Sequence, residues 1–330
     1  MSNMVYLGKM SYEWVNKLTL INNYLLRLVQ ETVKKYIDPN AEVVSIESTP
    51  ISMGLQAVEL MRHSVQLKIL DETSKWSLVS KYATMIERQV LTRLYSQGAS
   101  VPFSFSYGSE LDERFLICIQ DVDYQTNYSN INVSLLQKSE TKALAYIHAS
   151  NFGQRNELSW LPEVDSLYIE KTIFEWWRPQ WQAAKKNEQF IDIFGHYIPL
   201  VEAVADTIIE DIKHVINDES SQTLIHNDLN PGNVLVHNNS DVLFIDWEAT
   251  RYGSLFLDIP LRCGTEQIKD YRGLLADKSI EFSYDHFSQM YGIASRYLGL
   301  RYMSWNLGAW SNNSYAKDNL KKYLDMVVGN

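Results

Sequence analysis

The spacing of apolar and polar residues divides the chain into an N-terminal part with strand patterns and a longer part with helix patterns. Residues 11–37 place apolar side chains three or four positions apart, which predicts one amphipathic helix. From residue 42 to residue 81 the pattern is that of strands, and "DETSK" between the last two segments predicts a hairpin turn. "TMIERQVLTRLYSQG" predicts a helix that Gly98 ends, and "VPFSFSYG" and "RFLICIQDV" predict further strands. Residues 42–122 should therefore form a small, mainly antiparallel sheet interrupted by one helix.

Helical patterns dominate after the polar connector "DVDYQTNYSNIN". They include "LLQKSETKALAYIHASNF", "SLYIEKTIFEWWRPQWQAAKK" and "YIPLVEAVADTIIEDIKHVI", and they resume from about residue 258 onward. Two short apolar segments between them, "NVLVH" and "VLFID", are typical of strands. The pattern predicts an α+β fold of two lobes: a β-rich lobe over residues 1–122, which includes the helix over residues 11–37, and a mainly helical lobe over residues 123–330.

Composition is that of a soluble globular protein, with 45% hydrophobic and 21% charged residues. No apolar run approaches the roughly 18 residues of a membrane span, and the N-terminus has no signal-peptide pattern. Cys118 and Cys263 both lie among apolar residues, so we expect buried free thiols and a reducing, cytoplasmic compartment.

The charge is unevenly distributed along the chain. The net charge is −10, and residues 131–330 contribute −8 of it. Nucleic-acid binding requires a basic face, so this balance argues against a nucleic-acid partner. It permits a cationic ligand in the second half of the chain, although an acidic surface can also serve only to keep a protein in solution.

The segment "LIHNDLNPGNVLV", residues 224–236, concentrates polar side chains just before an apolar run. Asp228 and Asn233 lie five positions apart on a stretch with a Pro and a Gly, so a loop can turn both toward one point. Asp246 follows "VLFI", and a hairpin between "NVLV" and "VLFI" would bring it back beside Asn233. These oxygen donors suit Mg²⁺, which shares its ligands with substrate phosphates, and not zinc, which prefers Cys and His.

The order H-x-D-x-x-x-x-N with a later Asp is the layout of a kinase catalytic loop and metal site. In that layout Asp228 accepts the proton of the attacking hydroxyl, and Asn233 and Asp246 hold the metal ion. The alternative is a polar turn in which Asp228 caps the backbone and His226 is packed. The distance to "IDWE" and the strand-rich N-terminal lobe favour the kinase interpretation.

The string "LIHNDLNPGNVLV…VLFIDWEATRYGSLFLDI" resembles the aminoglycoside phosphotransferase and choline kinase family, whose usual pattern is close to H-G-D-x-x-x-x-N…I-D-W/F-E. The resemblance extends more weakly over residues 42–300. It implies a protein-kinase-like fold, with Asp228 as catalytic base and Asn233 and Asp246 as Mg²⁺ ligands. The family's residue at His226 shapes the loop and is not the base. Asn227 departs from the usual Gly, which bears on the geometry of the loop.

The same resemblance implies roles for two residues after the metal ligand. Asp258 matches a second Asp of the family, and we expect it to have a structural hydrogen-bonding role. Glu248 is a weaker candidate for either the metal or the structural role.

A kinase also needs a lysine on the nucleotide phosphates, and the N-terminal lobe offers one. Lys81 ends the strand "WSLVSK", and Glu87 lies on the helix just after it. A Lys–Glu pair of this kind positions the lysine on the α- and β-phosphates. The alternative for Lys81 is an ordinary charge at a strand end, and the downstream catalytic loop favours the nucleotide role.

Two further segments of the N-terminal lobe are candidates for nucleotide binding. "PISMGLQAV" lies where a phosphate loop should be and contains Ser52 and Gly54, although it matches G-x-G-x-x-G poorly. "LICIQDV" lies where the family has its inter-lobe hinge, and we expect the carbonyl of Gln120 and the N–H of Val122 to bind adenine. The alternative is that Gln120 simply ends a strand.

We therefore predict a kinase that transfers the γ-phosphoryl of ATP or GTP, with Mg²⁺, to a hydroxyl of a small cationic acceptor such as an aminoglycoside-like antibiotic. One alternative is a metabolic kinase for choline, ethanolamine, another amino alcohol or a sugar. Another is an inactive kinase-like binding protein, against which the intact Lys81, Asp228, Asn233 and Asp246 argue. A protein kinase is disfavoured because D-F-G and A-P-E motifs are missing. We expect no nucleic-acid or membrane partner.

The acceptor should bind to the helical lobe, where aromatic and acidic residues are dense. The tryptophans are candidates for the core or for an aromatic wall: Trp176, Trp177, Trp181, Trp305 and Trp310. The carboxylates are candidates for an acidic cleft: Asp192, Glu202, Asp206, Glu210, Asp211, Glu266, Asp270, Glu281 and Asp285. An aromatic and acidic wall would bind a hydroxylated cation. His148, alone on a predicted helix, is expected to be a packing residue.

Overall fold

The computed structural model describes residues 23–51, 60–107, 114–122, 132–237 and 240–329. The chain divides into two compact units. The first is Met1–Tyr124 together with Leu243–Glu248, and the second is Gln125–Val242 together with Ala249–Asn330. The first contains an antiparallel sheet and the second is mainly helical, which confirms the predicted α+β, kinase-like fold class.

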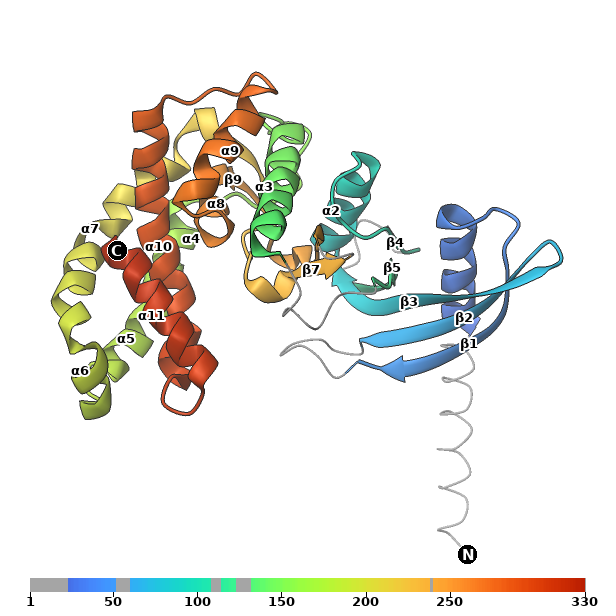
Figure 1. The fold of residues 1–330 in the computed structure, drawn as a ribbon, viewed down its shortest axis with the longest axis horizontal. Helices are drawn as coiled ribbons and strands as arrows, with labels where there is room; N and C mark the ends of the chain where they lie inside the picture. Colours follow the sequence, from blue (N-terminus) through green and yellow to red (C-terminus); the bar gives the residue numbers. More distant parts are fainter. Residues whose placement is uncertain (1–22, 52–59, 108–113, 123–131, 238–239, 330) are drawn as a thin grey trace, which may run out of the picture. The chain divides into compact units, whose positions relative to one another are not determined.

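The sheet of the first unit has, within the described residues, five strands in the order β1-β2-β3-β5-β4. The bounds are β1 Glu42–Pro50, β2 Met61–Ile69, β3 Glu72–Thr84, β4 Ser104–Phe105 and β5 Arg114–Gln120, with helix α2 at Met85–Ser96 (Figure 1). A helix over residues 23–36 covers one face; the predicted residues 11–22 of this helix lie outside the described residues. The core between helix and sheet consists of Leu28, Val29, Val33, Ala41, Val65, Leu67, Leu78, Phe103 and Cys118.

The turn between β2 and β3 is tighter than the sequence pattern predicted. Ile69 pairs with Glu72, so the turn consists of Leu70 and Asp71, and Leu70 has a φ of 56°. The prediction of a turn over "DETSK" was therefore wrong, because residues 73–75 already pair with β2. These polar residues suit a strand here because residues 72–77 are all exposed.

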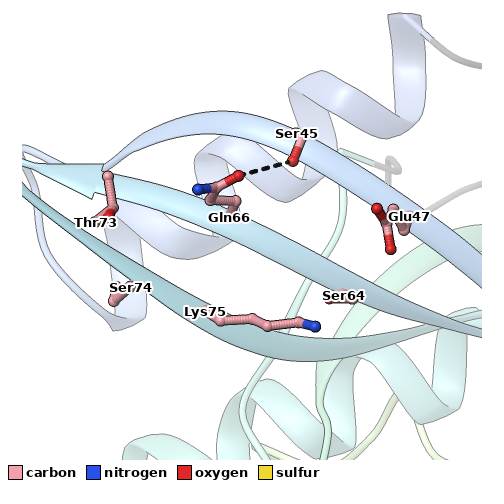
Figure 2. A pocket seen from close by; sticks show the side chains of 7 residues that line it. All are labelled: Ser45, Glu47, Ser64, Gln66, Thr73, Ser74 and Lys75. Atoms are coloured by element: carbon pink, nitrogen blue, oxygen red, sulfur yellow. Dashed lines mark hydrogen bonds between the residues drawn. The ribbon is translucent and has the colours of Figure 1, made fainter.

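The face of the sheet opposite the core is polar, because the strand residues that point to it are polar. On β1 the side chains next to Ile46 point to the face opposite the core, since successive strand residues alternate sides. With the neighbouring strands they line a shallow pocket of about 320 Å³. Its lining residues are Ser45, Glu47, Ser64, Gln66, Thr73, Ser74 and Lys75. Figure 2 shows Ser45 and Gln66 turned toward each other across β1 and β2. The pocket contains none of the predicted site residues.

The second unit is built from helices that Figure 1 shows in green to red. Their bounds are α3 Val133–Ser150, α4 Ser166–Lys171, α5 Arg178–Ala184, α6 Glu188–Phe194, α7 Ile198–Ile216, α8 Ile259–Arg262, α9 Thr265–Ala276, α10 Tyr284–Ala309 and α11 Ser314–Val328. None of the helices in the described ranges combines the length and apolarity required to cross a bilayer.

The predicted helix over "SLYIEKTIFEWWRPQWQAAKK" is not regular. A π-helical segment, Thr172–Trp177, separates α4 from α5, and a proline follows at the start of α5. Pro179 has no N–H to donate and its ring displaces the carbonyl of the preceding turn, so a wider turn before it relieves the clash. The apolar periodicity alone did not indicate this change.

Short strands bracket the loop with the kinase-like motif. β7 (Val234–His237) pairs with β8 (Asp241–Phe244), as predicted. β6 (Gln222–Ile225) pairs with β9 (Arg251–Ser254), and neither was predicted. β6 is buried along its whole length, so it lacks the polar and apolar alternation by which strands are recognised. It leads directly into the loop that begins at His226.

The packing of α10 against α11 depends on Gly299. A Cβ added there would lie 2.7 Å from Cγ2 of Val327 and 2.9 Å from the carbonyl oxygen of Tyr323. We expect Gly299→Ala to lower the free energy of unfolding by about 1–3 kcal/mol, a typical cost of overpacking. Chemical unfolding of both proteins measures it. Gly292→Ala on the same helix meets nothing within 4 Å and should instead stabilise by about 0.5–1 kcal/mol. Equal effects of the two changes would contradict the close contact.

Candidate active site

In the first unit, the predicted lysine lies between two carboxylates. Nζ of Lys81, near the end of β3, is 2.7 Å from Oε1 of Glu87 on α2 and 3.1 Å from Oδ1 of Asp246. Thr84 caps α2 through the backbone N–H of Glu87, which fixes the start of the helix directly after the strand. The Glu87 side chain is only 1% exposed, whereas that of Asp246 is 48% exposed.

Burial and charge oppose each other in this cluster. Burial alone would lower the pKa of Lys81, but the Glu87 and Asp246 carboxylates outweigh it and raise the pKa above its ordinary value. Burial raises the pKa of Glu87, and the adjacent ammonium of Lys81 counteracts this. Lys81 is therefore a cation with two competing anionic partners, of which the exposed Asp246 is the one within reach of other ligands.

Asp246 has a left-handed backbone, with a φ of 65°. Asp and Asn adopt this conformation more readily than most residues because their short polar side chains bond locally. Two positions later, Glu248 forms an ion pair with Arg114 of β5. The weaker candidate Glu248 is thus engaged by a structural partner.

The other nucleotide candidates lie at or just after the end of β5, or outside the described residues. Ser52 and Gly54 lie outside the described residues. Gln120 is the last residue of β5; its N–H donates to the carbonyl of Phe103 at 3.0 Å. Val122 is buried, with 6% of its surface exposed.

In the second unit, the motif loop brings Asp228 and Asn233 together. Nδ2 of Asn233 donates to the backbone carbonyl of Asp228 at 2.7 Å and to its Oδ2 at 3.2 Å. Asn230 also donates to Oδ2, at 3.4 Å, and accepts from the N–H of Gly232 at 2.8 Å. A short 3₁₀ turn over Pro231–Asn233 closes the loop before β7.

Asp258 fixes the backbone of this loop through hydrogen bonds. Its carboxylate accepts the N–H of His226 at 2.6 Å and the N–H of Asn227 at 2.8 Å. It also lies 3.2 Å from Nε2 of His148, whose Nδ1 is 2.6 Å from the hydroxyl of Tyr271. The expected structural role of Asp258 is confirmed, and His148 is a buried packing residue with polar partners on both sides.

The departure from the family pattern at Asn227 has a direct explanation. Asn227 has a φ of 62°, in the left-handed region that the usual glycine would adopt freely. Asn is among the residues that enter this region at low cost. The loop geometry is therefore compatible with Asn. His226 accepts the N–H of Asp228 on Nδ1 at 3.3 Å, which agrees with a role in shaping the loop.

Three residues that the sequence pattern did not identify contact the loop. Arg301 donates from Nη1 to Oδ1 of Asn227 at 2.6 Å and from Nη2 to its carbonyl at 2.7 Å. Tyr302 donates to Oδ1 of Asp228 at 3.1 Å. The hydroxyl of Tyr168 accepts from Nδ2 of Asn227 at 3.0 Å. The available signal was a cationic Arg inside the apolar stretch "YLGLRYM" of α10, where an unpaired charge would be costly.

The tryptophans divide between core and surface. Trp177, Trp181 and Trp310 are buried, whereas Trp176 and Trp305 are 45% and 53% exposed. Trp176 packs edge-to-face on Tyr168, with ring centroids 6.5 Å apart.

Three of the predicted acidic residues are engaged on their own helices or next to them. Glu202 accepts from Trp181 and Lys185, Glu210 pairs with Lys213, and Asp211 accepts from Thr207. Each of these three carboxylates is therefore held by side chains in or directly after α5, or in α7.

Comparison with known proteins shows the family of the chain. The family model described as "Phosphotransferase enzyme family" matches residues 83–261, more than half of the 330 residues. The chain belongs to this phosphotransferase family, which confirms both the predicted family and the prediction of a phosphotransferase enzyme acting on hydroxyl groups. A sequence comparison with curated proteins finds no match.

Solved structures show the same fold at low identity. A spectinomycin phosphotransferase, crystallised with ADP and spectinomycin, is 14% identical and has a TM-score of 0.56, with 91% of this chain and 97% of that one covered. A choline kinase from Streptococcus pneumoniae is 12% identical with a TM-score of 0.50, covering 93% and 99%. An ethanolamine kinase from Plasmodium vivax is 17% identical with a TM-score of 0.50, covering 88% and 84%.

Proposed function

We propose that this phosphotransferase moves the γ-phosphoryl group of ATP or GTP, with Mg²⁺, to a hydroxyl of a small cationic molecule. The observation that carries the proposal is the carboxylate of Asp228, which receives hydrogen bonds on both oxygens from Tyr302 and Asn233 on a loop fixed by Asp258. The spectinomycin phosphotransferase with bound ADP supports a nucleotide as the phosphoryl donor.

Asp228 acts as the general base in this proposal. Donors approach both of its oxygens, and a carboxylate accepts in this way when it is ionised. An ionised, oriented carboxylate can take the proton of an attacking hydroxyl, which typically contributes about 10²–10⁴-fold to the rate. The attacking oxygen then bonds to the γ-phosphorus as the bond to the bridging oxygen of the nucleotide breaks.

Lys81 contacts the nucleotide phosphates, and Glu87 holds it in place. Glu87 is buried against Lys81, so its charge needs that cation, whereas the exposed Asp246 can turn to another ligand. The phosphate loop with Ser52 and Gly54 and the hinge groups of Gln120 and Val122 complete the nucleotide site in this proposal.

Asn233 and Asp246 are the proposed Mg²⁺ ligands, and their chemistry suits this ion. Nδ2 of Asn233 is engaged by Asp228, so its Oδ1 is the atom that remains to coordinate, and the Asp246 carboxylate is half exposed. Within the described ranges no group of three or more His, Cys, Asp or Glu side chains could hold a metal ion. The proposed site differs from such a group because it combines one amide with one carboxylate. The ion would neutralise charge on the transferred phosphate.

The acceptor is proposed to carry a positive charge and a free hydroxyl. Residues 131–330 carry a net charge of −8, and the exposed Trp176 adjoins Tyr168, which contacts the catalytic loop. Arg301 is a cation beside this loop, but Asn227 engages its guanidinium. An antibiotic such as an aminoglycoside is the first candidate, and antibiotic resistance would follow; choline, ethanolamine or another amino alcohol is the second. The buried free thiols of Cys118 and Cys263 support a cytoplasmic location.

A screen of acceptors tests this proposal. Phosphorylation of spectinomycin, other aminoglycosides, choline, ethanolamine and neutral or anionic alcohols is measured by mass shift and nucleotide turnover. Cationic acceptors should react best, and their affinity should fall with salt, since the Debye length shrinks from about 10 Å at 0.1 M to about 3 Å at 1 M. A neutral or anionic best acceptor, bound equally well at both salt concentrations, would contradict the charge assignment and leave phosphotransfer intact. If the protein phosphorylates none of these compounds, the proposed class of acceptor is wrong.

A further inference from the structure

We infer that Arg301 and Tyr302 of α10 are positioning residues that hold the catalytic base in its reactive orientation, with the Asn227 side chain as the link. This inference rests on the proposed role of Asp228. It concerns the contact of α10 with the motif loop, and Arg301 and Tyr302 are not part of the sequence motif.

The guanidinium of Arg301 donates two hydrogen bonds to Asn227. It donates to the side-chain Oδ1 at 2.6 Å and to the backbone carbonyl at 2.7 Å, so one planar group fixes both the side chain and the peptide. The guanidinium carbon lies 5.2 Å from the ring centre of Tyr302 and 5.7 Å from that of Tyr168, which limits its movement. Arg301 is therefore a rigid clamp on the residue directly before the base.

The Asn227 side chain is fully used in this arrangement. Its Oδ1 accepts from Arg301, and its Nδ2 donates to the hydroxyl of Tyr168 and to the carbonyl of Ala249, each at 3.0 Å. A glycine would satisfy the φ of 62° with less strain but would lose all three contacts. The amide at this position therefore links α10, α4 and the loop.

Tyr302 acts on the base itself. Its hydroxyl donates to Oδ1 of Asp228 at 3.1 Å, while Asn233 donates to Oδ2 at 3.2 Å. Asn230 donates to Oδ2 as well, at 3.4 Å, and donors on both oxygens fix the plane of the carboxylate. Reaction requires the acceptor hydroxyl and the base to meet within hydrogen-bond distance, and a misplacement of about 1 Å can cost about 10²-fold in rate.

The test compares Asn227→Gly, Tyr302→Phe and Arg301→Met with the wild-type protein. The substrate is whichever of spectinomycin, choline and ethanolamine the wild type phosphorylates, or water in slow ATP hydrolysis if it phosphorylates none. Each variant should lose about tenfold to a hundredfold in kcat with the KM for ATP unchanged. Arg301→Lys, which keeps the charge but not the planar fork, should recover only part of the loss. The double variant Asn227→Gly with Arg301→Met should lose less than the product of the two single losses, because both variants remove the hydrogen bond from Arg301 to Oδ1 of Asn227.

Two controls on α10 separate positioning from stability. Tyr291→Phe removes a hydroxyl that donates to the carbonyl of Cys263 at 2.8 Å, and Arg296→Met removes an exposed arginine. Both should keep the wild-type kcat, and thermal unfolding measures the stability of every variant. If Arg301→Met fails to fold, Asn227→Gly and Tyr302→Phe carry the test.

The outcomes also separate this inference from the proposed function. Wild-type kcat in both Asn227→Gly and Tyr302→Phe would overturn the positioning role while Asp228→Asn still removes turnover. Wild-type turnover in Asp228→Asn would instead overturn the proposed base, and the inference with it.

Discussion

Asp228→Asn should lower turnover by about 10²–10⁴-fold while the affinity for Mg·ATP stays close to that of the wild type. The change keeps the size of the side chain but removes the negative charge and the proton acceptor. It also places an NH₂ group against existing donors, since Tyr302 donates to one oxygen and Asn233 and Asn230 donate to the other. Steady-state kinetics with the best acceptor from the screen, together with calorimetric titration of Mg·ATP, measures both parts.

Asp165→Asn is the matched control for this prediction. Asp165 is an exposed residue of the same unit whose side chain caps α4 through the N–H of Tyr168. Asn caps helices about as well as Asp, so this variant should retain the wild-type turnover and stability. If Asp228→Asn stays within about a factor of two of the wild type, Asp228 is not the base.

The strongly patterned elements of this chain were accessible from its sequence. The helix that carries Glu87 and the strand that ends near Lys81 were predicted because each has a clear period and a clear end. The structure accordingly places Lys81 and Glu87 in contact at 2.7 Å. The roles of these residues toward a nucleotide stay predictions.

Other features have no local signal in the sequence. β6 and β9 are four residues long, and β6 is buried throughout, so neither alternates as a half-exposed strand does. The contact of Arg301 with Asn227 joins residues 74 positions apart and depends on how α10 packs. The left-handed backbone of Asn227 is set by the loop and by Asp258, which residue spacing does not encode.

The site also shows why a departure from a motif can be informative. A glycine at position 227 would indicate only that the backbone there is left-handed. The asparagine meets the same requirement and adds an amide with three partners: Arg301, Tyr168 and Ala249. Asn227→Gly therefore removes the side-chain contacts and keeps a residue that tolerates the left-handed backbone. Asn227→Ala would remove the same contacts and strain the backbone as well.

Asp246→Ala should weaken Mg²⁺-dependent nucleotide binding by tenfold or more, since even the loss of a residue that only supports a metal ligand typically costs about 10–100-fold in metal affinity. The carboxylate is exposed and bonded to Lys81, which keeps Glu87 as its second partner when Asp246 is removed. Because Asp246 has a φ of 65°, Asp246→Asn is a necessary companion: Asn tolerates this backbone and lacks the charge. Titration of ATP with and without Mg²⁺ measures the effect.

Two controls define what this loss means. Glu248→Ala removes a nearby carboxylate that pairs with Arg114, and it should leave the Mg²⁺ dependence unchanged. Lys81→Ala should weaken phosphate binding without altering the Mg²⁺ requirement, because an ammonium contacts phosphate directly and the ion is held by oxygen ligands. If Asp246→Ala and Asp246→Asn bind Mg·ATP as the wild type does, and Mg²⁺ stimulates all three equally, Asp246 is not a metal ligand. Its contact with Lys81 would then be the whole of its role.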